Sequence, residues 1–135
     1  MNSEPVNPWG SCFDSAGRVF LLNEIWPEDA RLCHGIGIAN KPGEEGVVMA
    51  HAWIEFEMPD YTGYTGRAAL DPIWMVAQEA EVYRRNFQVS KVVEYTREEF
   101  RQLWIEHNYP GPWDPEIKAQ TKEGKAECLA SAPAV

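Results

Sequence analysis

Hydrophobic and small residues alternate along residues 31–40 (RLCHGIGIAN). Because successive side chains of a strand point to opposite faces, this alternation predicts a strand with one apolar face and one sparse, glycine-bearing face. After the loop KPGEEG, residues 47–58 (VVMAHAWIEFEM) predict a second, longer strand. One of its faces is wholly apolar, and the other, which carries His51, changes from apolar to charged along the strand. His51 is therefore expected where the core meets solvent.

Shorter patterns predict further elements. Residues 67–71 (RAALD) predict a third strand, ended by a proline that cannot donate to a sheet, and residues 90–96 (SKVVEYT) predict a fourth. An S-x-x-D start signal before apolar residues at helical spacing predicts a helix at about 12–24. Within it, Gly17 is expected where another element approaches closely. Residues 74–86 show only weak helical periodicity.

A capping box formed by Thr96 and Glu99 predicts an amphipathic helix at about 97–108. With their short connections, these elements predict an α+β domain. Its antiparallel sheet has about four strands, the cysteine-bearing helix packs on that sheet, and the amphipathic helix follows toward the C-terminus. Residues 1–114 are expected to form this single domain, and the polar, alanine-rich residues 115–135 a flexible tail.

Charge and hydropathy narrow the classes of partner. The chain has 21 acidic and 12 basic residues and a net charge of -9 at pH 7, which disfavours binding to nucleic acid. Its apolar stretches are much shorter than the roughly 20 residues that a membrane span requires. The first residues, MNSEPVNPWG, lack the basic and apolar regions of a secretory signal. We therefore expect a cytoplasmic protein with neither nucleic acid nor membrane as partner.

The three cysteines form an odd set without CxxC spacing, which favours free thiols over a disulfide framework or a structural zinc site. A zinc site made of Cys12, Cys33, His34 and His51 would lack compact ligand spacing, so no metal and no cofactor is expected. Cys33 faces the glycine side of its strand and is expected to be inert. Cys128 lies in the expected tail, where exposure would make it easy to modify.

Cys12, His51 and Asp71 combine the residue types that nucleophilic catalysis needs. At the opening turn of a helix, the Cys12 sulfur would lie near unpaired backbone N–H groups, which favours a thiolate. His51 lies within one strand and Asp71 ends the next, and antiparallel neighbours are only about 5 Å apart. Taken singly, a buried cysteine or a hydrogen-bonded strand histidine is ordinary. Together they supply a nucleophile, a base and a group that orients the base.

The motifs around these residues resemble the core of transglutaminase-like members of the papain-like superfamily. The matching stretches are Ser11-Cys12, His51-Ala52-Trp53-Ile54-Glu55 and Leu70-Asp71-Pro72. The resemblance covers roughly residues 10–75, and His34-Gly35 and the ending 109–113 are similar to small proteins of bacteria and their phages. It implies a cysteine hydrolase or acyl transferase that acts on an amide or isopeptide bond of a peptide, protein or other amide substrate. Cys12 would attack, His51 would move the proton and Asp71 would orient His51.

The chain departs from that family at its N-terminus. Only 11 residues precede Cys12, where larger relatives carry helices that line the substrate groove, so substrate choice stays open. No glutamine can be identified as the oxyanion donor. The candidates for oxyanion or substrate binding are the Cys12 backbone N–H, Asn7, Trp9 and Trp53.

Several residues have simpler interpretations. His34 has apolar neighbours on its strand face and is expected to be a hydrogen-bonded core histidine rather than a base or a metal ligand. Glu55 and Glu57 share a face with His51 and are expected to form a solvated edge. A catalytically inactive scaffold is the alternative function. It would engage a basic protein through its acidic surface and the exposed aromatic residues Tyr61, Tyr64 and Trp113.

Overall fold

The computed structural model describes residues 11–23, 25–38, 46–58, 63 and 65–121. Its sheet has five antiparallel strands in the order β4-β3-β2-β1-β5. The strands are β1 (Arg31–Ile38), β2 (Val48–Glu57), β3 (Arg67–Asp71), β4 (Val76–Glu79) and β5 (Lys91–Tyr95). The helices are α1 (Ser11–Leu22), α2 (Ala80–Phe87), α3 (Arg97–His107) and α4 (Pro115–Lys118).

The predicted antiparallel α+β architecture is confirmed, with five strands in place of about four. The additional strand, β4, occupies the first part of the segment with weak helical periodicity, and α2 occupies the second. A segment that changes from strand to helix changes its period from 2 to 3.6, so neither period dominates over its whole length.

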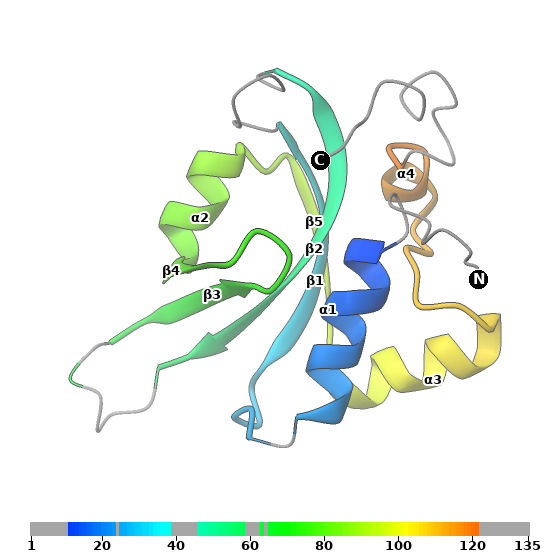
Figure 1. Ribbon diagram of the computed structural model, residues 1–135, viewed down its shortest axis with the longest axis horizontal. Helices are drawn as coiled ribbons and strands as arrows, with labels where there is room; N and C mark the ends of the chain where they lie inside the picture. Colours follow the sequence, from blue (N-terminus) through cyan, green and yellow to red (C-terminus); the bar gives the residue numbers. More distant parts are fainter. Residues whose placement is uncertain (1–10, 24, 39–45, 59–62, 64, 122–135) are drawn as a thin grey trace, which may run out of the picture.

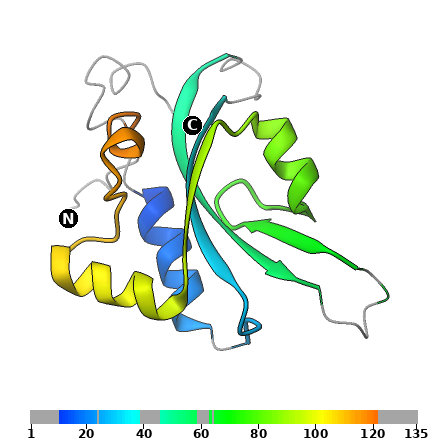
Figure 2. The ribbon, with the colours of Figure 1, turned by 180° about the vertical axis from the view of Figure 1, so that it is seen from behind.

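The sheet separates two apolar cores (Figure 1). α1, α3 and α4 lie on one side, where Phe13, Phe20, Phe100 and Ile117 are buried against the sheet. α2 lies on the other side, as the view from behind also shows (Figure 2). There Trp53, Tyr83 and Phe87 form a second cluster. Among the described residues, no helix is long and apolar enough to span a membrane.

Local sequence signals account for how α1 and α3 meet. The predicted capping box opens α3: Thr96 Oγ1 accepts from the Glu99 backbone N–H at 3.0 Å, and the Glu99 carboxylate accepts from the Thr96 N–H at 2.9 Å. Gly17 lies in α1, and a Cβ there would come within 2.6 Å of the Phe100 ring. The expected close approach at Gly17 is thus made by α3, and a larger residue would push the two helices apart.

The predicted tail does not begin at residue 115. Residues 115–118 form α4, whose first turn is capped by the Asp114 carboxylate. Ile117 is fully buried in the core that α1 and α3 cover. The burial of this one apolar side chain fixes the polar segment to the domain. The composition of the segment gives no sign of this contact. The rest of the expected tail, 122–135, lies outside the described residues.

Candidate active site

The structure brings Cys12, His51 and Asp71 together. His51 Nε2 lies 2.7 Å from Asp71 Oδ2, and both side chains are buried. The Cys12 side chain is a further hydrogen-bonding partner of the His51 ring. Cys12 itself is half-buried, not sealed beneath other side chains.

Among the described residues, the part of β2 that carries His51 is not paired with β3. β1 pairs with β2 over its full length, whereas β3 pairs only with Ile54–Glu57. His51 therefore has no described strand neighbour on the β3 side. α1 packs on the opposite face of β2, which carries Ala50 and Ala52. Cys12, in the first turn of α1, packs against the core on that face.

The Asp71 carboxylate is held by four donors. Its Oδ1 accepts from the backbone N–H groups of Ile73 and Trp74, each at 2.9 Å. Its Oδ2 accepts from Tyr83 Oη at 2.6 Å as well as from His51. Burial alone would raise the pKa of Asp71, but these hydrogen bonds and the charge of His51 hold the pKa below its usual value. Asp71 therefore stays a carboxylate of fixed orientation.

His51 is electrostatically tuned by the same contacts. Burial disfavours the charged ring, yet the hydrogen bonds and charges of Asp71 and Cys12 outweigh it and raise the pKa of His51 from 6.5 to about 9. The imidazolium is therefore the favoured form at neutral pH. An imidazolium beside a cysteine is the arrangement in which a thiolate serves as nucleophile.

Two aromatic residues complete the surroundings of the imidazole. Trp74 stacks on the His51 ring, and Phe87 meets it edge-on with ring centroids 5.9 Å apart. Neither Trp74 nor Tyr83 was predicted from the sequence to belong to the site. A signal exists for each: Trp74 belongs to the turn that starts at Asp71-Pro72, and Tyr83 lies on the buried face of α2 with Ala80 and Phe87.

Trp53 does not fit the expected role in substrate binding, because it is fully buried. Its ring fills the space above Gly35, where a Cβ would come within 2.6 Å of it. Its indole N–H donates to Glu55 Oε2 at 2.8 Å. In this structure Trp53 is thus a buried packing residue. The other two candidates, Asn7 and Trp9, lie outside the described residues.

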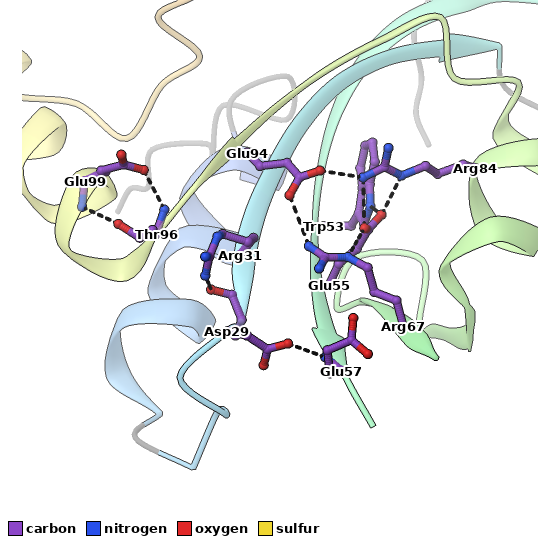
Figure 3. A network of polar contacts seen from close by, with 11 residues as sticks. Asp29, Arg31, Trp53, Glu55, Glu57, Arg67, Arg84, Glu94, Thr96 and Glu99 are labelled. Carbon is purple, nitrogen blue, oxygen red and sulfur yellow. Dashed lines mark hydrogen bonds and ion pairs between the residues drawn. The ribbon is translucent and has the colours of Figure 1, made fainter. Parts of the chain in front are cut away.

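Glu55 is not part of a solvated edge. Its side chain is fully buried and pairs with Arg67 at 2.7 Å and with Arg84 at 2.8 Å (Figure 3). Glu94 bridges the same two arginines from β5. These pairs connect β2, β3, α2 and β5 on the face that carries His51. Glu57, two residues further along, is exposed as expected.

His34 lies in the core as expected, but without the expected hydrogen bonds. Both ring nitrogens are buried and have no partner within the described part of the chain. The imidazole is surrounded by the rings of Phe13, Tyr95, Phe100 and Trp113. Burial lowers its pKa from 6.5 to about 3, so the ring is neutral at physiological pH.

The same cluster corrects the expectation for Trp113. Its indole packs on His34, Tyr95 and Phe100, and its N–H is buried, so it is not an exposed aromatic ready for a partner. Tyr61 and Tyr64 lie outside the described residues.

The remaining thiols and possible metal ligands take no part in the cluster of Cys12, His51 and Asp71. Cys33 is buried, and burial together with Glu55 and Glu94 raises the pKa of its thiol well above the usual value. Cys128 lies outside the described residues. Within the described ranges, no group of three or more His, Cys, Asp or Glu side chains is placed to hold a metal ion.

Comparisons of the chain with protein-family models, with curated proteins and with solved structures found no match.

Proposed function

We propose that the chain is a cysteine hydrolase or acyl transferase that acts on an amide or isopeptide bond of a peptide, protein or other amide substrate. The observation that carries this proposal is the connected series of a half-buried thiol, an imidazole and a carboxylate, formed by Cys12, His51 and Asp71. The carboxylate makes four hydrogen bonds, one of them to His51, so the imidazole has a fixed orientation before any substrate binds.

The reaction would proceed in two steps. The Cys12 thiolate attacks the carbonyl carbon and forms a carbon–sulfur bond, while the carbonyl oxygen takes the negative charge. As the tetrahedral intermediate collapses, the carbon–nitrogen bond breaks and His51 gives its proton to the leaving amine. Water or an amine then attacks the thioester and loses a proton to His51, and the thiolate leaves. Water gives hydrolysis, and an amine gives acyl transfer.

The first turn of α1 is the natural place to stabilise the oxyanion. Cys12 is the second residue of this helix, and the first backbone N–H groups of a helix have no partner within it. The N–H of Cys12 and those of the adjoining turn would donate to the oxygen on which charge develops.

An acidic docking scaffold receives less support from the described surface. A shallow hollow of about 520 Å³ between β5 and α3 is lined by three glutamates. All three are already engaged: Glu94 with two arginines, Glu98 with Arg101 and Glu99 with the capping box. The charges of Glu94 and Glu98 are therefore already paired with arginines before a basic partner could bind.

Alkylation with iodoacetamide at about pH 6, followed by mass mapping, tests the proposal. We expect rapid modification of Cys12, none of Cys33 in the native protein, and loss of the rapid phase in Cys12→Ala. Cys33→Ala is the matched control and should keep the rapid phase. If Cys33 reacts faster than Cys12, or if native Cys12 is no faster than a denatured thiol, the assignment of the nucleophile fails.

A second measurement separates catalysis from mere thiol reactivity. p-Nitrophenyl acetate should acetylate Cys12 in a burst of p-nitrophenol, and His51→Gln should abolish that burst. The later decay of the thioester distinguishes the two reactions: transfer accelerates when a primary amine such as glycinamide is added, and hydrolysis does not. A reactive Cys12 whose acetyl group is never released would support the inactive scaffold instead.

A further inference from the structure

Tyr83 binds the same oxygen of Asp71 that holds His51. We propose that Tyr83 acts on the candidate active site through Asp71. Its hydroxyl draws charge away from the Asp71 carboxylate and so makes His51 a better proton donor to the leaving group. This inference rests on the proposed function, because it concerns how the imidazole of that site gives up its proton.

The position of the Tyr83 hydroxyl is fixed by packing. Tyr83 projects from α2 and is only 3% exposed. Its ring packs on Trp53, with centroids 5.1 Å apart, and on Phe87 from the next turn of α2. The hydroxyl of the phenol held in this way donates to Asp71. At 2.6 Å, its hydrogen bond to Asp71 Oδ2 has the length of a strong, charge-assisted bond.

Tyr83 is not needed to orient the carboxylate. The two backbone N–H groups of Ile73 and Trp74 already hold Asp71 Oδ1. Because these bonds come from the main chain, they persist whatever residue stands at position 83. The effect of the Tyr83 hydroxyl therefore falls on the charge of Oδ2, the oxygen to which His51 Nε2 is bonded.

That charge affects the transfer of the proton from His51 to the leaving amine. A carboxylate with its full charge would hold the imidazolium tightly and make it a weak acid toward a departing amine. A second donor on the same oxygen takes up part of that charge, so the carboxylate holds the imidazolium less tightly. The titratable groups that face the imidazole among the described residues are Cys12 from α1 and Asp71 from β3, with Tyr83 of α2 and Cys33 of β1 beyond them.

Titration of the histidine rings by NMR in Tyr83→Phe tests this inference. The chain has only three histidines, and His51→Gln identifies the signal. Removing the hydroxyl should make His51 hold its proton to a pH higher by about half a unit, because one donor to its partner is lost. An unchanged midpoint, or one that falls toward 6.5, would overturn the inference. Tyr95→Phe is the matched control, since it removes the hydroxyl of a buried tyrosine on the opposite face of the sheet.

A second variant keeps the test valid if Tyr83→Phe folds poorly. Fluorotyrosine incorporated at position 83 is a more acidic phenol and a stronger donor, so it should lower the His51 midpoint instead. These titrations need no turnover. A shifted His51 beside an unreactive Cys12 would keep the role of Tyr83 and reject the proposed function, whereas a reactive Cys12 with unshifted His51 would do the reverse.

Discussion

The indole of Trp74 stacks on the imidazole of His51, with ring centroids 3.9 Å apart and an interplanar angle of 11°. It covers one face of the ring beside the hydrogen bond to Asp71. Trp74→Ala should admit water to that face. We expect the His51 ring proton bonded to Asp71 to exchange with solvent at least several-fold faster, as measured by the broadening of its NMR signal.

Trp74→Phe is the control for this effect, because a phenyl ring keeps part of the cover. It should give an intermediate exchange rate. Equal exchange rates in the wild type and the alanine variant would mean that Trp74 packs beside the imidazole without shielding it.

Asp71→Asn should remove the decrease in the free energy of unfolding at alkaline pH that His51 causes. The pKa of His51 is raised from 6.5 to about 9 in the folded protein. Its contribution to stability is therefore fully present below pH 6.5 and is lost as the pH rises through about 9. Without the carboxylate, burial dominates and the pKa falls, so this alkaline loss should disappear. Alkylation of Cys12 near pH 6 should also slow by at least about tenfold.

The free energy of unfolding, measured by urea denaturation across neutral to alkaline pH, checks this expectation. Glu98→Gln on the exposed face of α3 also removes one negative charge, as Asp71→Asn does, and is the matched control. It should leave the shape of the pH profile unchanged. An alkaline loss that persists in Asp71→Asn would show that another group causes it.

The sequence allows much of the sheet, and the proximity of Cys12 to His51 and Asp71, to be predicted. Alternation identifies β1 and β2, a capping box marks α3, and the adjacency of two strands brings an imidazole and a carboxylate together. These signals are local, or involve neighbouring strands joined by one loop. The hydrophobic periodicity of these elements is visible in the sequence because each element faces a single environment along its length.

What the sequence conceals depends on contacts between distant residues. Glu55 looks like an exposed strand residue because its partners, Arg67 and Arg84, lie 12 and 29 positions away. Tyr83 meets Asp71 only because α2 folds over β3, a placement that no local pattern specifies. The apolar position Ile117 likewise gains its meaning from the core that α1 and α3 form around it.

Glu55→Gln should destabilise the fold strongly. The substitution keeps the shape of the side chain but removes the buried charge that pairs with Arg67 and Arg84. Because the arginine side chains are 29% and 30% exposed and keep Glu94, we expect a cost of about 2 kcal/mol. Glu57→Gln, at an exposed position of the same strand, should change the free energy of unfolding by less than about 0.5 kcal/mol. Urea denaturation of the two variants measures the difference, and equal small losses would mean that the network contributes little.

The buried imidazole of His34 should make the protein sensitive to mild acid. Its pKa is about 3 in the folded chain against an ordinary value of 6.5, so the unfolded state binds the proton first as the pH falls. The free energy of unfolding should then decrease by about 1.4 kcal/mol for each pH unit below 6.5. Between about pH 4.5 and 6.5 this loss is largely separate from that of carboxylates, whose ordinary pKa values are lower.

His34→Phe should abolish that loss without a large cost at neutral pH. The ring makes aromatic contacts on several sides and no hydrogen bond in the described structure, so an apolar ring of similar shape removes an unsatisfied polar group. His107→Gln, at an exposed position of α3, is the control and should keep the acid slope of the wild type. If both variants retain the slope, the His34 imidazole is not the acid-sensitive group. If only His34→Phe flattens it, one neutral imidazole in an aromatic core sets the lower pH limit of the fold.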